Sequence, residues 1–226
     1  MRITAIVPAA GMGIRLGSAV PKQFMELEGK PVLIYSLEVL NQVEDISDII
    51  VSGSASGVSV IKKLLRTFSI GKVLDVVEGG KERMQSVRNA FDTIRTTDYV
   101  LIHDAARPFV TRAVVEGVIR AGIAHDAAIS AIPVNDTVKF VDAGGTIVRN
   151  VDRRGLWLAQ TPQVFRHSLL ARAYELYDRQ PAEVTDESGM VELMGVPVKA
   201  VAGSLLNIKI TNDDDLALAR LIARTA

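Results

Sequence analysis

Short apolar runs rich in β-branched residues alternate along the chain with segments in which apolar positions recur every three or four residues. The apolar runs predict strands at residues 3–7, 48–51, 73–77, 99–103 and 127–133. The periodic segments predict helices at residues 31–40, where Pro31 is expected at the first helical position, and at 58–68, 83–95 and 111–124. Strands that alternate with helices indicate an α/β fold, with a Rossmann-like, mostly parallel sheet covered by helices on both faces.

This alternation breaks after Pro133. Residues 137–141 and 146–149 flank the turn sequence Asp142-Ala143-Gly144-Gly145 and predict a β-hairpin. An isolated hairpin is marginal in water, so this one needs a surface to pack on. We expect a projecting arm at about residues 134–156 that pairs with a second subunit, with a flap on its own domain as the alternative.

The last third of the chain returns to alternating helices and strands. Helices are expected at residues 167–178 and 185–194, and short strands at 198–201 and 207–210. The sequence Thr211-Asn212-Asp213-Asp214 predicts a capping box for a C-terminal helix at residues 213–224. We find no repeat, low-complexity segment or linker, so a single domain over residues 1–226 is expected.

Composition narrows the class of protein. The chain has 226 residues, a hydrophobic content of 48% and equal numbers of basic and acidic residues, 26 of each. The zero net charge argues against a nucleic acid or a membrane surface as partner. The absence of cysteine excludes disulfides and thiolate catalysis. No apolar run has membrane-spanning length and no targeting segment precedes the first strand, so we expect a cytoplasmic enzyme.

The segment after the first predicted strand carries the clearest chemical signal. Residues 8–16 read PAAGMGIRL, and Pro21-Lys22-Gln23 follows shortly after. Small residues and glycines let the backbone approach a bound group, and their N–H groups can point at phosphate. Arg15 and Lys22 add two positive charges to the same place. The pattern predicts a binding site for a polyphosphate.

Two common phosphate-binding patterns do not match this segment. The dinucleotide pattern requires G-x-G-x-x-G, whereas the third glycine here, Gly17, is one position late. The second predicted strand also lacks an acidic residue at its end. The P-loop requires a Gly-Lys pair where Leu16 stands.

Two further loops follow predicted strands. Gly79-Gly80 precedes a helix, and Ser86 in its first turns can offer a hydroxyl to a nucleobase, although a plain strand-to-helix loop explains the same pattern. Asp104 ends a strand and suits Mg²⁺, which prefers oxygen ligands. Arg107 suits a second phosphate, with an Asp–Arg ion pair that closes the loop as the alternative. We expect His103 to be packed or hydrogen-bonded rather than catalytic.

Several strings together resemble those of the 2-C-methyl-D-erythritol 4-phosphate cytidylyltransferase family, from the first strand to the C-terminal helix. They are the phosphate loop through Phe24, GGKERMQSV at residues 79–87, HDAARP at 103–108, PVNDTVK at 133–139 and DRRGLWLAQTPQ at 152–163. Departures are small: Leu16, Phe24 and Tyr35 replace commoner residues. Leu205-Leu206 is apolar where several relatives carry a polar or acidic residue, which leaves a second carboxylate at the metal site open.

The resemblance implies a nucleotide-diphospho-sugar transferase type of fold and transfer of CMP from CTP to 2-C-methyl-D-erythritol 4-phosphate. It also implies Mg²⁺ as cofactor and a homodimer in which the arm brings Arg153 to the neighbouring subunit. The implied CTP-binding residues are Pro8, Ala9, Ala10, Gly11, Gly13, Arg15, Lys22, Gly80, Ser86, Asp104 and Ala105. The implied substrate-phosphate residues are Asp104, Arg107, Thr137, Arg153, Thr161 and Lys209. Arg15, Lys22, Arg153 and Lys209 would be catalytic, and Asp104 would hold the metal.

Two other functions stay open at this point. Ribitol 5-phosphate cytidylyltransferases are built on the same plan, although residues 137–139 and 156–160 favour methylerythritol phosphate. A non-catalytic nucleotide-binding subunit is the other alternative. The presence of Arg15, Lys22, Asp104, Arg153 and Lys209 argues against it.

Overall fold

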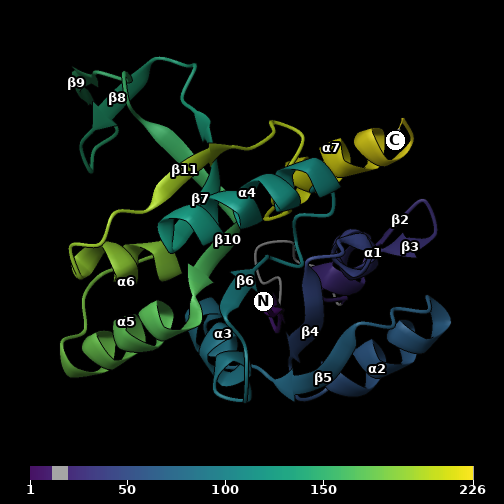
Figure 1. Ribbon diagram of the computed structural model, residues 1–226. Helices are drawn as coiled ribbons and strands as arrows, with labels where there is room; N and C mark the ends of the chain where they lie inside the picture. The colour runs from purple at the N-terminus through teal and green to yellow at the C-terminus, as the bar shows by residue number, and fades with distance from the viewer. Residues whose placement is uncertain (12–19, 226) are drawn as a thin grey trace.

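The computed structural model describes residues 1–11 and 20–225 (Figure 1). A seven-stranded sheet with the order β11-β7-β10-β6-β1-β4-β5 forms its centre. The strands are β1 (Ile3–Ala9), β4 (Ile46–Gly53), β5 (Val73–Glu78), β6 (Tyr99–Ile102), β7 (Ala127–Pro133), β10 (Trp157–Arg166) and β11 (Lys199–Ala202). Strand β10 runs antiparallel to both of its neighbours, β6 and β7, whereas the other pairs in the sheet are parallel.

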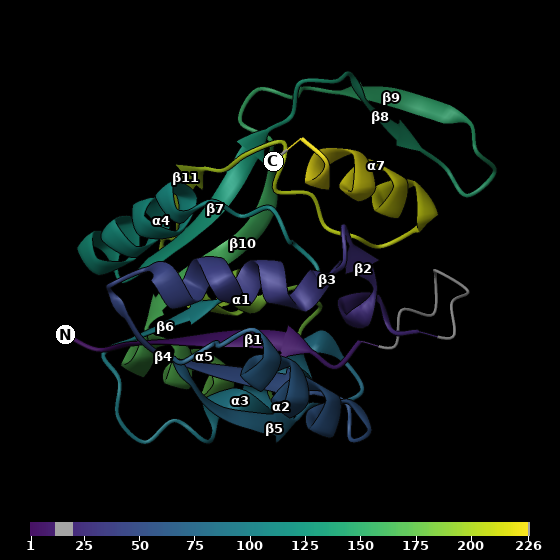
Figure 2. The same ribbon diagram turned by 90° about the vertical axis from the view of Figure 1, so that its right-hand side faces the viewer.

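Helices cover both faces of this sheet (Figure 2). Ile3, Ala5 and Val7 of β1 belong to one apolar cluster, which α1 (Val32–Gln42), α2 (Gly57–Thr67) and α4 (Arg112–His125) complete. Ile6 belongs to a second cluster on the opposite face, with α3 (Arg83–Phe91), α5 (His167–Arg179) and α6 (Glu187–Leu193). Side chains that alternate between two buried faces explain why the strands read as continuous apolar runs. The predicted α/β fold class is confirmed.

A third, smaller cluster joins the two ends of the chain. After the short helix η2 (Lys22–Phe24), the strands β2 (Glu26–Leu27) and β3 (Lys30–Pro31) form a small hairpin. Leu27 and Val32 pack with Ile210 and with Leu216 of α7 (Asp213–Ala223). This packing places the segment before α7 beside the segment that follows the phosphate loop.

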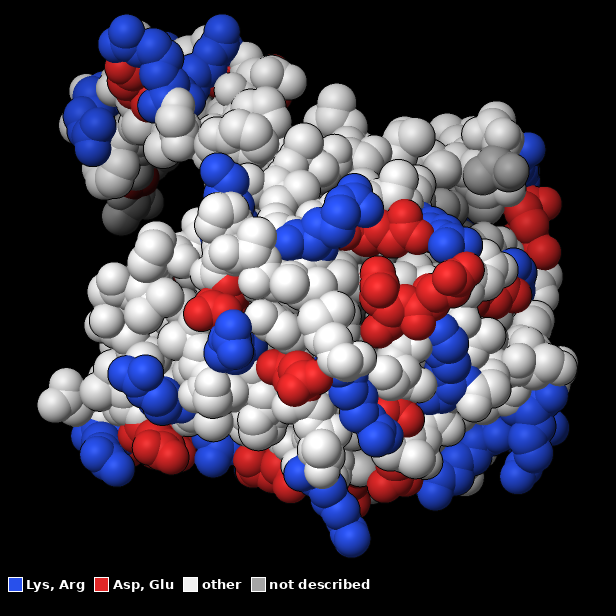
Figure 3. Space-filling view, viewed as in Figure 1, with Lys and Arg blue, Asp and Glu red and all other residues white. Residues whose placement is uncertain are grey.

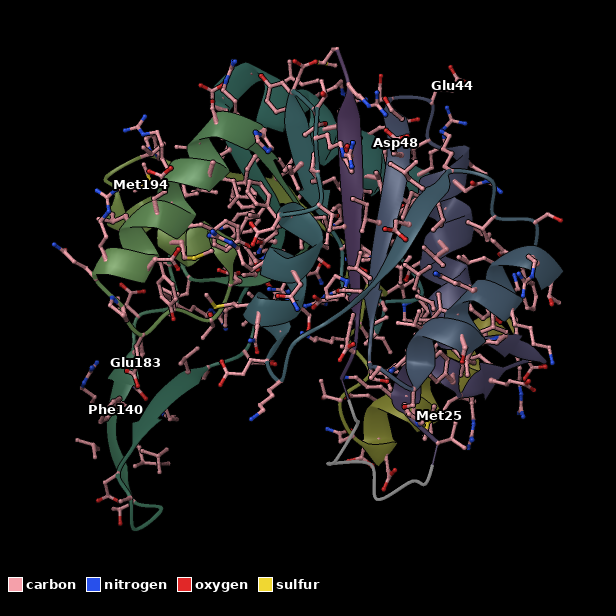
Figure 4. All side chains as sticks on the ribbon, turned by 90° about the horizontal axis from the view of Figure 1, so that it is seen from below. Met25, Glu44, Asp48, Phe140, Glu183 and Met194 are labelled. Atoms are coloured by element: carbon pink, nitrogen blue, oxygen red, sulfur yellow. The ribbon has the colours of Figure 1, made fainter. Side chains whose placement is uncertain are left out.

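The predicted hairpin is present as a separate two-stranded sheet, β8 (Val138–Val141) and β9 (Ile147–Val151). Gly145, with φ at +82°, forms its turn, a conformation that favours glycine. The hairpin projects from the body, and Phe140 lies out on it (Figures 1 and 4). We call residues 134–156 the arm.

Some local predictions were wrong. Strand β10 was not predicted, and residues 207–210 form an extended loop rather than a strand. Helix α3 ends at Phe91, and Pro31 is the N-cap of α1 rather than its first helical residue. The capping box of α7 starts one residue later than expected, because Asn212 is the N-cap and the Asp215 carboxylate accepts from the N–H groups of Thr211 and Asn212. Within the described part of the chain, no helix is long and apolar enough to cross a membrane.

Candidate active site

An open pocket lies at the carboxyl ends of β1, β5 and β6. Ten of the expected site residues line it together: Pro8, Ala9, Ala10, Gly11, Lys22, Gly80, Ser86, Asp104, Ala105 and Lys209. Gln23, Lys81, Glu82, Arg83 and Ala106 complete the lining. Ligands of open α/β sheets bind at this end of the strands. Gly13 and Arg15, which were also expected here, lie outside the described residues.

Close backbone contacts hold the loops of the pocket together. The N–H of Ala105 donates to the carbonyl of Pro8 at 3.4 Å, which joins the loops after β1 and β6. A Cβ on Gly79 would lie 2.6 Å from the Cβ of Ala10, so a side chain at this position would push the loops after β1 and β5 apart. The Ser86 hydroxyl accepts the N–H of Gly80 at 3.1 Å and donates to the carbonyl of Glu82 at 2.9 Å. These contacts, made by residues of the sequence motifs, hold the loops of the pocket in place.

Gln23, the residue that follows Lys22, positions Lys22 at the pocket. The buried amide of Gln23 donates to the carbonyl of Ala9 at 2.7 Å and ties the short helix η2 to the end of β1. The Lys22 ammonium donates to the carbonyl of Ile210 at 3.0 Å, so it contacts the segment that carries Lys209. Two cations from distant parts of the sequence, Lys22 and Lys209, thus line the same pocket.

Asp104 is the electrostatic centre of the site. Its Oδ1 accepts from Nε of Arg83 at 2.7 Å, and its Oδ2 pairs with the Lys209 ammonium at 2.6 Å. Burial alone would raise the pKa of Asp104, but the charges and hydrogen bonds of Arg83 and Lys209 outweigh burial and hold this pKa well below its ordinary value. Asp104 is therefore ionised at neutral pH.

Arg83 lies within the motif at residues 79–87, but no role was predicted for it. Its Nη1 donates to Oε2 of Glu187 at 2.7 Å, and its pKa is raised because these two carboxylates outweigh the effect of burial. For Glu187, the sequence predicted only a place near the start of the helix at residues 185–194. Its side chain is 0% exposed, and burial raises its pKa while Arg83 holds that rise back. No local pattern reveals this pair, because its members are 104 residues apart.

The buried side chains of His103 and Thr161 hold the loop that follows β6 and carries Asp104. The buried imidazole lies 3.1 Å from the Thr161 hydroxyl and 3.2 Å from the carbonyl of Arg107. Burial lowers the pKa of His103 to about 4, so this side chain is neutral at neutral pH, in agreement with the expected packing role. The N–H of Asp104 donates to the Thr161 hydroxyl at 3.0 Å. Thr161, expected at the substrate phosphate, is buried here and does not line the pocket.

Three other expected substrate residues also lie away from the pocket lining. Arg107 donates to the carbonyl of Asn207 at 2.7 Å, and its Nε lies 4.0 Å from Asp104, as the ion-pair alternative proposed. Burial lowers its pKa. Thr137 and Arg153 are exposed on the arm, where Arg153 donates to the carbonyl of Asn135. In a single chain these residues are not brought to the pocket.

The donor set at Asp104 suits a cation that arrives with a substrate. Among residues 1–11 and 20–225 there is no group of three or more His, Cys, Asp and Glu side chains that could hold a metal. Mg²⁺ is often bound by one or two carboxylates together with substrate phosphates and water. The single Asp104 carboxylate fits that mode. Its oxygens are paired with Arg83 and Lys209, so a metal would compete with one of these cations.

Basic side chains outnumber acidic ones in the described lining, with Lys22, Lys81, Arg83 and Lys209 against Glu82 and Asp104. A cationic pocket with small-residue loops at the ends of parallel strands, in this fold, defines an α/β nucleotidyltransferase. Residues 3–225 match the model of the 2-C-methyl-D-erythritol 4-phosphate cytidylyltransferase family, and the chain belongs to this family.

Individual relatives agree over their whole length. The chain is 40% identical to the 2-C-methyl-D-erythritol 4-phosphate cytidylyltransferase of Geotalea uraniireducens, over 100% of this chain and 98% of the relative. The structure is similar to that of 4-diphosphocytidyl-2C-methyl-D-erythritol synthase from Anaerococcus prevotii, with a TM-score of 0.87, 30% identity and coverage of 98% and 96%. A cytidylyltransferase structure from Thermus thermophilus has a TM-score of 0.80, 31% identity and coverage of 99% and 100%.

Thr161 offers a test of the support beneath Asp104. Replacement of Thr161 by Val keeps the shape but removes the acceptor of the Asp104 N–H and the partner of His103. We expect Thr161→Val to lower the free energy of unfolding by about 1–3 kcal/mol, because buried polar groups lose their partners. Thr161→Ser, which keeps the hydroxyl, is the control. Equal stability of Thr161→Val and wild type in urea titrations would show that the hydroxyl does not hold the loop.

Proposed function

We infer that the pocket around Asp104 is where this chain transfers the cytidylyl group of CTP to 2-C-methyl-D-erythritol 4-phosphate. The products are 4-diphosphocytidyl-2-C-methyl-D-erythritol and pyrophosphate, in the non-mevalonate route to isoprenoid precursors. The assignment of this reaction rests on the membership of the chain in the cytidylyltransferase family. The lining of one pocket by Lys22, Arg83 and Lys209, two of which pair with the Asp104 carboxylate, is the observation that supports this pocket as its site.

The chemistry explains why cations matter here. An oxygen of the 4-phosphate attacks the α-phosphorus of CTP, and a new P–O bond forms. The bond from the α-phosphorus to the oxygen that bridges to the β-phosphorus breaks, and pyrophosphate leaves with that electron pair. The attacking oxygen is already an anion and needs no general base. The barrier comes from bringing two anions together and from the charge that moves onto the leaving group.

Each described residue then has a role that fits its position. The backbone of residues 8–11 and the Lys22 ammonium bind the triphosphate, with Arg15 expected to add a second charge. Gly80 and Ser86 line the part of the pocket where the cytosine would bind. Lys209, which already contacts Asp104, orients the attacking phosphate. Orientation of two bound reactants removes much of the entropic barrier.

We propose Mg²⁺ as the cofactor, held by Asp104 together with phosphates of CTP. When bound, the ion neutralises charge on the phosphate oxygens. An ion held by Asp104 would compete with Lys209 and Arg83 for the two carboxylate oxygens. Lys209 is the side chain freed most easily, because it is an ammonium on a flexible stem, whereas Arg83 is also held by Glu187.

We further propose a homodimer in which the arm of each subunit reaches the pocket of its partner. Apolar side chains on the arm are exposed, among them Phe140 at 51% and Ile147 at 59%. Lys and Arg side chains cover much of the arm in the view of Figure 3. A second copy of the chain would bury the apolar side chains and place the cationic Arg153 beside an anionic substrate. A twofold axis would then build two equivalent sites.

The direct test is to incubate the protein with CTP, Mg²⁺ and one polyol phosphate at a time. We expect release of pyrophosphate with 2-C-methyl-D-erythritol 4-phosphate and far less with ribitol 5-phosphate. The nucleotide product is identified by mass spectrometry. A preference for ribitol 5-phosphate would favour the sister activity, and binding of CTP without pyrophosphate release would favour a non-catalytic subunit.

For Lys22, we predict that Lys22→Ala lowers kcat by on the order of 10²–10³, the scale of one lost transition-state contact. Steady-state kinetics measure the effect, and circular dichroism checks the fold. Lys30→Ala is a matched control, because Lys30 pairs with Glu38 outside the pocket. If Lys22→Ala keeps a wild-type kcat, Lys22 has no part in the chemical step.

For the metal, we predict that activity requires Mg²⁺ and that Asp104→Asn is nearly inactive. The asparagine keeps the shape but not the charge that attracts a hard cation. Binding of Mg²⁺ in the presence of CTP, measured by calorimetry, should weaken in Asp104→Asn. Full activity of the wild type in excess chelator would reject the cofactor.

The shared site is tested with two inactive variants, Lys22→Ala and Arg153→Ala. In a mixed dimer one site would collect both defects, and the other would be intact. Random reassortment makes about half the dimers mixed, so roughly a quarter of all sites should be wild type. The two variants are unfolded, mixed and refolded together, with each refolded alone as control. No recovery, although mixed dimers form, would mean that Arg153 acts in its own subunit.

A further inference from the structure

One buried carboxylate near the pocket is not used by the reaction as described above. Glu187 is the first residue of α6, and its side chain is 0% exposed. It does not line the pocket, and burial of a carboxylate is unfavourable unless a charged partner compensates. Its partner is Arg83, at 2.7 Å, and Arg83 does line the pocket.

The guanidinium of Arg83 connects two carboxylates through one rigid plane. Its Nε donates to Asp104 and its Nη1 to Glu187, both at 2.7 Å. Because the guanidinium is planar, fixing the edge at Glu187 also fixes the direction of the N–H that reaches Asp104. Lys209 holds the other oxygen of Asp104 but is an ammonium on a flexible stem. Arg83 is therefore the partner that sets the orientation of the Asp104 carboxylate.

The charges also require Glu187. Arg83, Arg107 and Lys209 approach Asp104 within 4.0 Å, and Asp104 supplies one negative charge to this group. Glu187 supplies the second. Without it, Arg83 would be a largely buried cation with a single partner, and a phosphate of the substrate would attract it away from Asp104.

We propose that Glu187 is a positioning residue for cytidylyl transfer: its contact with Arg83 keeps the guanidinium against Asp104 and off the substrate phosphates. This inference rests on the proposed function of the pocket. It assigns to Glu187 no contact with substrate, metal or reacting atoms. Its effect on the reaction passes through Arg83.

The test combines Glu187→Gln with Arg83→Met, singly and together. Glu187→Gln keeps the shape but removes the charge. We expect its kcat to fall by about 10–100-fold, because small displacements of reacting groups have effects of this size, while KM for CTP changes by less than about threefold. Rates of pyrophosphate release give both constants, and thermal melts give Tm.

The double variant separates positioning from packing. Arg83→Met leaves Glu187 buried without a partner, so we expect a lowered Tm and a lowered kcat. The double variant should have a higher Tm than Arg83→Met and a kcat within about twofold of Arg83→Met. Glu187 acts on the reaction only through Arg83 in this proposal, so its loss has little further effect once Arg83 is replaced. A further large loss of kcat in the double variant would overturn the proposal. This comparison also decides the matter if Glu187→Gln alone does not fold.

Asp186→Asn is the matched control. Asp186 is the neighbouring carboxylate, and it bonds to Gly189, Ser188 and Gln163 but not to Arg83. Its kcat should stay within about twofold of wild type, since asparagine also caps helices well. A kcat of Glu187→Gln equal to wild type, or an equal loss in Asp186→Asn, would overturn the role of Glu187. A wild-type protein that releases no pyrophosphate would instead reject the proposed function itself.

Discussion

The ion pairs of Asp104 with Arg83 and Lys209 are the contacts on which the arrangement of the pocket depends. Asp104 follows β6, Arg83 opens α3 and Lys209 precedes α7, so one carboxylate joins three segments distant in sequence. Buried charges are unfavourable unless they are paired. A pocket built to bind phosphates carries an excess of cations. In the proposed function, the Asp104 carboxylate would stabilise those cations while no phosphate is bound.

The strand β10 connects this charge cluster to the sheet. It lies between β6 and β7, and its Thr161 accepts the N–H of Asp104. Gln160 donates to the carbonyl of Ser204, and Asn207 donates to the carbonyl of Thr161. The loop that carries Lys209 is thereby fixed to the strand that supports Asp104. The middle of β10 lies beside the carboxyl end of β6, where Gln163 pairs with Ile102. Thr161 therefore lies within reach of Asp104, which follows β6.

The sequence predicted the parallel strands well, since strands buried on both faces appear as apolar runs. It did not reveal β10, because Pro162 and the polar Gln160, Thr161 and Gln163 lie in its middle. Those side chains are buried in the structure, where three of them bond to segments distant in sequence. Lys22 and Asp104 were predicted from their places after the first and fourth predicted strands, whereas Lys209 was identified through a family resemblance. The pair of Arg83 and Glu187 was not, because a contact across 104 residues leaves no local pattern.

The two halves of the proposed site differ in what holds them in place. The nucleotide half is built on the ends of buried strands and is fixed by contacts such as Gln23 to Ala9 and Ala105 to Pro8. The acceptor half depends on Arg153, which lies on an arm whose apolar residues are exposed. An isolated two-stranded hairpin is only marginally stable in water, so a hairpin with so little burial gains stability from a surface that it packs against. In the proposed dimer, the site for the second anion would therefore be complete only after assembly, because Arg153 would come from the partner subunit.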